Sequence, residues 1–189
     1  MAIESLHRTA ARRRTVLKAL AFAPLGPVLA GSAPAAATQE RALAFQHTHT
    51  GERLRVVYYA RGGYLPDALG SVDRLLRDFR TGDQHPIDPR LLDTLCALGA
   101  ACGGGAFEII SGYRSPGTNA MLRRASTGVA QASLHTTGRA IDVRLVGTDT
   151  ARLRDAAIAL AQGGVGYYPA SDFVHLDTGR VRTWGPRAG

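Results

Sequence analysis

The stretch Ser133-Leu-His-Thr-Thr-Gly-Arg-Ala-Ile-Asp142 determines how this chain folds and where its chemistry lies. Its first half is polar and rich in turn-forming residues, whereas residues 139–145 alternate between polar and apolar side chains, as a strand does. The apolar residues of this strand then face the core, and Asp142 stands on the opposite face of the sheet. The pattern predicts a loop that brings His135 over a sheet surface bearing a carboxylate.

A second segment, Asp172-Phe-Val-His-Leu-Asp177, alternates in the same way and places His175 and Asp177 on one strand face. If the two strands are neighbours, Asp142 and His175 project from the same sheet surface, and the loop with His135 can fold over both. Two neutral imidazoles and one carboxylate leave a fourth position on zinc for water, which is the arrangement of a catalytic site. We therefore expect a hydrolase that binds Zn²⁺ through His135, Asp142 and His175.

The remaining elements predict an α+β fold. Strands are expected from alternation or short apolar runs, and helices from apolar residues at intervals of three and four. The expected strands are 43–48, 54–59, 107–111, 165–168, 173–177 and 181–184, and the expected helices are 66–80, one that begins after Asp88, 119–126 and 150–162. These strands should form a mostly antiparallel sheet, with the helices packed on one side and the zinc cleft on the other.

The N-terminus predicts export. Arg12-Arg-Arg-Thr-Val-Leu-Lys18 fits the twin-arginine pattern, an apolar segment follows from 19 to 30, and the small residues of 33–37 supply cleavage sites. The apolar segment is interrupted by proline and glycine, and it is shorter than the about 20 residues that a spanning helix needs. We expect a twin-arginine signal peptide over residues 1–37, one mature domain over 38–189, and a periplasmic protein with no stable membrane insertion.

The charge of the chain is positive but moderate. The formal net charge is +8, and the signal region contributes half of it, because that region contains five basic residues and one acidic residue. The basic residues of the mature domain are scattered and have no interleaved aromatic stripe, which argues against nucleic-acid binding. A moderate positive charge suits an anionic polymer such as the cell wall.

The two cysteines, Cys96 and Cys102, are six positions apart in and after the second predicted helix. A continuous helix would point them in different directions, so a disulfide requires the helix to break near Gly99. An oxidising compartment favours disulfides. The sequence leaves both a disulfide and two buried thiols open.

The pattern around the ligands resembles that of a known family. Residues 133–142 read S-x-H-x-x-G-x-A-x-D, and H-x-D follows after a helix-length gap. With this pattern the chain resembles the murein endopeptidase K group of zinc peptidases, which share the D-alanyl-D-alanine carboxypeptidase and hedgehog fold. The blocks Ser111-Gly-Tyr-Arg-Ser-Pro-Gly-Thr-Asn119 and Gly164-Val-Gly-Tyr-Tyr-Pro169 extend the resemblance, which covers residues 41–185.

The resemblance implies roles for three further side chains. Arg114 corresponds to the family's arginine that faces the zinc and stabilises the oxyanion formed when water attacks a peptide carbonyl. Asp172, three residues before His175, occupies the place of an acidic general base, although strand parity turns it away unless the residues before it are still in a turn. Asp177 shares the face of His175 and can orient its imidazole. We assign Asp172 as the base and Asp177 as its support, and the reverse assignment stays open.

The resemblance implies an exported zinc metallopeptidase that cleaves peptide cross-links of peptidoglycan. Its partners would be the peptide stems of peptidoglycan, and we expect a monomer. Two alternatives remain from the sequence: a D-alanyl-D-alanine-type carboxypeptidase, and a non-catalytic zinc-containing module that binds the cell wall, because a fold alone does not settle activity. Which cross-link is cleaved does not follow from the residues.

Overall fold

The computed structural model describes residues 40–125 and 130–186, which belong to one compact unit. The predicted signal peptide over 1–37 lies outside the described residues. Within the described part of the chain, no helix is long and apolar enough to cross a membrane.

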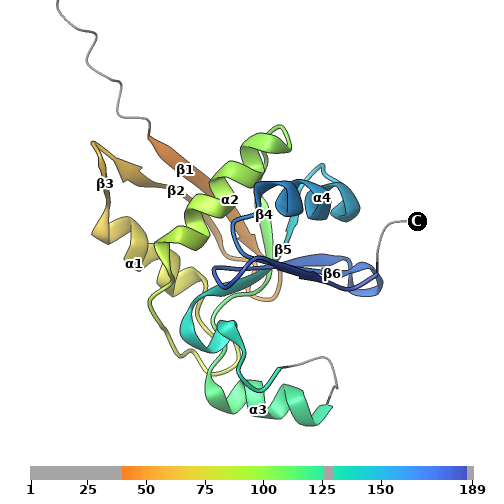
Figure 1. Cartoon of the computed structure of the whole chain (residues 1–189). Coiled ribbons are helices and arrows are strands. Elements are labelled where there is room, and N and C mark those ends of the chain that lie inside the picture. The colour runs from red at the N-terminus through yellow and green to blue at the C-terminus, as the bar shows by residue number, and fades with distance from the viewer. Residues whose placement is uncertain (1–39, 126–129, 187–189) are drawn as a thin grey trace, which may run out of the picture. The chain divides into compact units, whose positions relative to one another are not determined.

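The elements alternate between strands and helices along the chain (Figure 1). The strands are β1 (Arg41–His47), β2 (Arg53–Ala60), β3 (Gly63–Tyr64), β4 (Phe107–Ser111), β5 (Ala140–Leu145), β6 (Gly164–Tyr168), β7 (Phe173–Asp177) and β8 (Arg182–Trp184). The α-helices are α1 (Pro66–Leu75), α2 (Pro89–Ala101), α3 (Pro116–Ala125) and α4 (Thr150–Leu160), and two 3₁₀ turns are η1 (Leu134–Thr137) and η2 (Pro169–Ser171). The predicted α+β class is confirmed.

All eight strands form one mixed sheet in the order β3-β2-β1-β4-β5-β7-β6-β8. The β1–β4 and β6–β8 pairs are parallel, and the other pairs are antiparallel. At the centre, β5 and β7 are antiparallel neighbours with Asp142 opposite His175. The neighbouring strands that the sequence analysis assumed are therefore present, and both side chains project from one sheet surface.

The core lies between the sheet and three of the helices. Alternate residues of β5 and β7 are fully buried against α2 and α4, whose leucines form the other half of the core. Helix α2 begins where Asp88 accepts a hydrogen bond from the backbone N–H of Arg90, as the sequence predicts for its cap. Burial of these apolar faces orients β5 and β7, so that their polar residues face away from the helices.

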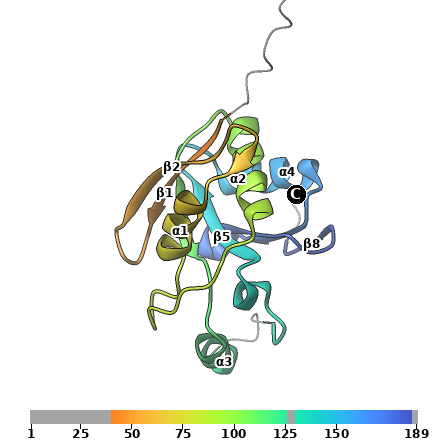
Figure 2. The same ribbon diagram turned by 90° about the vertical axis from the view of Figure 1, so that its left-hand side faces the viewer.

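Helix α3 differs from the prediction that all helices cover one side of the sheet. Figures 1 and 2 both show it on the side opposite α2 and α4. The physical reason is its composition, since among its described residues only Thr118 and Asn119 are buried and it has no apolar stripe to pack against the core. It lies on the side of the sheet from which Asp142 and His175 project, and it is not a layer of the core.

Helix α1 is shorter than predicted and ends at Leu75 instead of near Arg80. The chain turns because the buried carboxylate of Asp78 accepts hydrogen bonds from the backbone N–H of Arg80, 3.0 Å away, and of Ser115, 2.9 Å away. These bonds attach the segment after α1 to the loop after β4. The thiols of Cys96 and Cys102 are both free.

Candidate metal centre

Three donor atoms converge above the β5–β7 pair. The Nε2 atom of His135 lies 3.3 Å from Oδ1 of Asp142 and 3.2 Å from Nδ1 of His175, and the latter two atoms are 2.8 Å apart. Ligands at about 2.0–2.1 Å from a tetrahedral zinc are separated by roughly 3.3 Å, so the three atoms fit the corners of one coordination sphere. The donor set of two imidazole nitrogens and one carboxylate oxygen also suits zinc.

The ring of His135 is oriented by the backbone. Its Nδ1 atom donates a hydrogen bond to the carbonyl oxygen of Gly112, 2.7 Å away, which leaves Nε2 with its lone pair directed at Asp142. The 3₁₀ turn η1 holds this ring over the sheet, and Gly138, in the left-handed conformation at φ 65°, ends the turn. Burial lowers the pKa of His135, which keeps the imidazole neutral, as a metal ligand must be.

The ring of His175 is oriented by Asp177. Its Nε2 atom lies 3.1 Å from Oδ2 of Asp177, which leaves Nδ1 as the ligand atom. Asp177 is itself held by both terminal nitrogens of Arg182, at 2.9 and 2.7 Å. Burial raises the pKa of Asp177, but the hydrogen bonds from His175 and Arg182 outweigh it and hold the pKa well below its usual range. This carboxylate is a fixed anion and a weak base.

Arg114 faces the same site. Its Nη2 atom lies 3.5 Å from Oδ2 of Asp142, and its Nη1 atom lies 3.4 Å from Oδ1 of Asn119. Burial lowers the pKa of the guanidinium, and the charge of Asp142 counteracts this shift. The Nε atom is buried without a hydrogen-bond partner among the described residues, so Arg114 retains a donor for an oxygen that enters the site.

Asp172, the predicted base, does not line the cavity that contains the other predicted site residues. It ends η2 with φ 50°, and its carboxylate accepts hydrogen bonds from Thr150 Oγ1 at 2.9 Å and Arg144 Nη1 at 3.1 Å. Its side chain is 58% exposed and does not line the cavity. The left-handed turn at position 172 rotates the carboxylate toward α4, which is the parity conflict that the sequence analysis left open.

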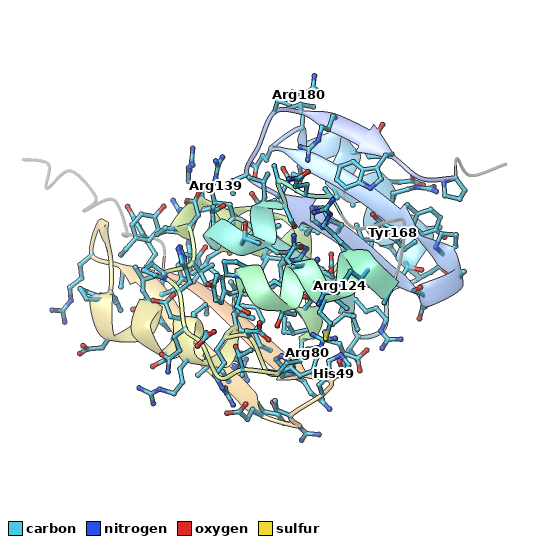
Figure 3. All side chains as sticks on the ribbon, turned by 90° about the horizontal axis from the view of Figure 1, so that it is seen from below. His49, Arg80, Arg124, Arg139, Tyr168 and Arg180 are labelled. Carbon is cyan, nitrogen blue, oxygen red and sulfur yellow. The ribbon has the colours of Figure 1, made fainter. Side chains whose placement is uncertain are left out.

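His135, Asp142 and His175 line a cavity of about 420 Å³. Residues from η1, the segment before it, and strands β6 to β8 line this cavity; the aromatic ones are Tyr168, Phe173 and Trp184. Figure 3 views the molecule from the cavity side, with Tyr168 labelled. The ring centroid of Trp184 is 5.1 Å from that of His175, and its Nε1 atom donates to Oη of Tyr168 at 2.8 Å. The aromatic rings form one wall beside the metal ligands.

Three residues of this site were not predicted from the sequence. Arg182 holds Asp177, Trp184 lines the cavity, and Asn119 contacts Arg114 while its amide donates to the carbonyl oxygens of Ala130 and Gln131. A signal for two of them was present, because Arg182 and Trp184 alternate on a short strand directly after the H-x-D segment. No sequence pattern indicated a role for Asn119, because its contacts with Arg114 and with the loop at 130–131 depend on how α3 packs.

A sheet surface with a His₂Asp tripod, an orienting carboxylate and a buried arginine defines a metal-dependent hydrolase. Comparison with known proteins identifies the family. Residues 35–184 match the model of the peptidoglycan L,D-endopeptidase MepK family, and the chain belongs to that family. This confirms the resemblance seen in the sequence.

Two curated relatives are similar over most of the chain. The probable peptidoglycan L,D-endopeptidase MepK of Haemophilus influenzae is 44% identical over 146 residues, which are 76% of this chain and 78% of the relative. The peptidoglycan L,D-endopeptidase MepK of Escherichia coli K12 is 41% identical over 169 residues, which are 85% of this chain and 93% of the relative. No solved structure matches the chain.

Proposed function

We propose that this protein is a zinc-dependent endopeptidase that cleaves peptide cross-links of peptidoglycan. The observation that carries the proposal is the convergence of His135, Asp142 and His175 in a cavity that also contains Arg114, in a chain of the L,D-endopeptidase family. A wall-binding module needs neither an open ligand position nor a free arginine donor. We also propose that the fold is the one shared by D-alanyl-D-alanine carboxypeptidases and hedgehog proteins.

A zinc ion in this tripod would polarise the scissile carbonyl and activate a water molecule for attack. The residues of the chain supply the surroundings for that step. Arg114 faces the site with an unused Nε–H, so it can stabilise the negative charge that develops on the carbonyl oxygen. Asp177 and the carbonyl oxygen of Gly112 hold the two imidazoles in the ligating orientation, which limits the reorganisation needed during the reaction.

The position of Asp177 supports an orienting role rather than that of the base. It lines the cavity but is fully engaged with His175 and Arg182, and its depressed pKa makes it a poor proton acceptor. Asp172 would have to leave Arg144 and Thr150 to reach the cavity. We therefore assign Asp177 to positioning and give Asp172 no part in proton transfer.

We further propose that the protein is exported by the twin-arginine route, loses its signal near residue 37 and acts as a monomer on peptide stems in the periplasm. The relatives named above carry the name of a peptidoglycan peptidase, and peptidoglycan lies outside the cytoplasm, which supports this location. The support for the route itself is the arginine pattern of the N-terminus.

The test is digestion of purified cross-linked muropeptides, with products identified by mass spectrometry. An endopeptidase converts dimers to monomers, whereas a carboxypeptidase removes one terminal residue and leaves dimers intact. We expect monomers, loss of activity with a chelator and recovery with zinc. Intact dimers after digestion by zinc-loaded protein would contradict the proposal, and trimmed dimers would favour the carboxypeptidase.

A further inference from the structure

Several exposed arginines on the cavity side of the molecule have no acidic partner. Arg80, Arg123, Arg124 and Arg180 are exposed, and none of them forms an ion pair with a described residue. Figure 3 shows Arg80, Arg124 and Arg180 on the same face as Tyr168 of the cavity wall. We call these four residues the basic rim.

The segments that build this face contain few acids. From Ile109 to Ile141 the sequence has no aspartate or glutamate but four arginines, and this segment includes α3 and the residues of η1 that line the cavity. From Thr178 to Pro186 it again has no acid but contains Arg180 and Arg182. The acids that do line the cavity, Asp142 and Asp177, are paired with Arg114 and Arg182. These two segments therefore bring more positive than negative charge to the cavity side of the molecule.

Two of the rim arginines are neighbours in the chain. Arg123 and Arg124 lie in the last turn of α3, and neither has an acidic partner among the described residues. Like-signed charges that remain close together without counterions are unfavourable, and the energy is regained only when an anion binds between or beside them. The rim arginines are therefore available to a ligand, and unpaired arginines far from the cavity, such as Arg74 and Arg152, serve as the comparison.

We propose that the basic rim binds the free carboxylates of peptidoglycan peptides and holds the polymer over the metal cavity. This inference rests on the proposed function and specifies how the substrate is recognised. Glycan strands without acidic substituents offer no charge, so the carboxylates of the peptide stems are the groups that arginines on this face would contact. The contacts raise affinity and association rate, and they take no part in bond cleavage.

The arrangement favours a peptide polymer over a membrane. The exposed apolar side chains on α3 and the turn before β8 include Met121 and Val181, which are single residues, whereas an interfacial helix needs a continuous apolar face. Three rim arginines also share a face with Tyr168 of the cavity wall (Figure 3), and a flat lipid surface does not enter such a cavity. An anionic membrane is therefore the competing outcome to be tested.

The experiment compares two double variants of the full mature domain. The rim variant is Arg123→Gln with Arg124→Gln on α3. The matched control is Arg74→Gln with Arg152→Gln, which removes the same charge from exposed, unpaired arginines on α1 and α4, on the opposite side of the sheet. None of the four residues touches the metal ligands, and the melting temperature of each variant is measured to exclude unfolding.

Binding is measured by co-sedimentation with isolated sacculi, either native or with their carboxylates converted to amides. We expect the rim variant to bind native sacculi about 3- to 10-fold more weakly than the parent, and the control variant to bind like the parent. The difference should disappear on amidated sacculi and near 1 M salt, where the Debye length is about 3 Å. With soluble cross-linked muropeptides as substrate, the rim variant should have a higher KM than the parent and an unchanged kcat.

Three results would contradict the proposal that the rim binds peptide carboxylates. Equal weakening of binding in both double variants would show a general charge effect, and an undiminished difference between them on amidated sacculi would exclude carboxylates as the ligand. Stronger rim-dependent binding to vesicles with anionic lipid than to sacculi would assign the face to a membrane. The parent's activity on muropeptides is read separately. If the parent cleaves no muropeptides but still binds sacculi through the rim, the proposed peptidase function is wrong and the proposed binding surface is supported.

Discussion

His175 uses both nitrogens of its ring, and this explains why an H-x-D segment is needed rather than a lone histidine. Nδ1 faces Asp142 and His135, while Nε2 contacts Asp177 on the same strand face two residues later. Because residues two positions apart lie on the same face of a strand, Asp177 lies beside His175 without the need for a further element. Arg182 then keeps the carboxylate charged and aligned.

The first prediction concerns the metal ligands. We expect His135→Ala and His175→Ala each to lose most of their zinc, because two ligands cannot hold the ion as the tripod does. Elemental analysis of purified protein measures this directly. His49→Ala is the matched control, since His49 is exposed and outside the cluster. Full zinc occupancy in both ligand variants would show that the metal binds elsewhere.

The second prediction separates the two acids near His175. Asp177→Asn should weaken zinc affinity by roughly 10–100-fold, because the amide no longer fixes the charge and tautomer of the ring. Asp172→Asn should keep zinc and turnover close to the parent values, since this side chain is directed at Arg144 and Thr150. A zinc titration against a competing chelator and turnover at saturating zinc are the measurements. If Asp172→Asn binds zinc but loses about 10²–10⁴-fold in turnover, Asp172 is the base after all.

At the scale of elements, the loop after β4 connects the core to the site, and we call this contact between the loop and the end of α1 the joint. Gly112 offers its carbonyl oxygen to His135, Tyr113 donates its N–H to the carbonyl of Leu76, and Arg114 enters the cavity. The end of α1 and the buried Asp78 therefore determine where Arg114 stands. This explains why α1 stops early, because a longer helix would displace the turn that holds the loop.

The third prediction tests this joint. A Cβ atom at position 112 would lie 2.5 Å from the carbonyl oxygen of Leu76, so Gly112→Ala must separate the loop from α1. We expect a loss of about 1–3 kcal/mol in the free energy of unfolding and a lower turnover. Gly117→Ala is the control, because a Cβ atom there meets nothing within 4 Å. Denaturant unfolding measures the stability, and muropeptide cleavage measures the turnover. Parent-like stability in Gly112→Ala would show that the loop after β4 can move away from α1 without loss of stability.

At the scale of the whole molecule, the two faces of the sheet have different roles, one in the core and one in the site. One face packs against α1, α2 and α4 to form the core, and the other bears the proposed metal ligands beside η1 and the last strands. Figures 1 and 2 show α3 on the side of the sheet opposite α2 and α4. The division allows the polar face to bury charged groups that the apolar core could not accommodate.

The fourth prediction concerns export of the whole chain. Replacing Arg13 and Arg14 with lysine should leave the precursor in the cytoplasm, because the twin-arginine route requires the arginine pair. Cell fractionation followed by immunoblotting measures the ratio of precursor to mature protein. Replacement of Arg8 and Arg12 with lysine is the matched control and should be exported. Normal processing of the first variant would indicate the general secretory route.

The sequence by itself determined the class of fold and predicted the three proposed ligands, because both follow from local alternation. A period of two assigns each side chain of β5 and β7 to a face, and burial of the apolar face leaves Asp142 and His175 only one direction to point. The proposed ligands and the acid beside His175 were therefore accessible from the sequence, whereas the pairing of β5 with β7 was a condition that the structure fulfils.

Only the tertiary structure decided the rest, since it depends on contacts between segments distant in the chain. The left-handed turn at Asp172 directs its carboxylate to α4, the polar surface of α3 keeps that helix out of the core, and Asn119 reaches Arg114 across a loop. No local pattern specifies such contacts. Alternation fixes the face on which a side chain lies within an element, whereas the packing of elements decides which partner that face meets.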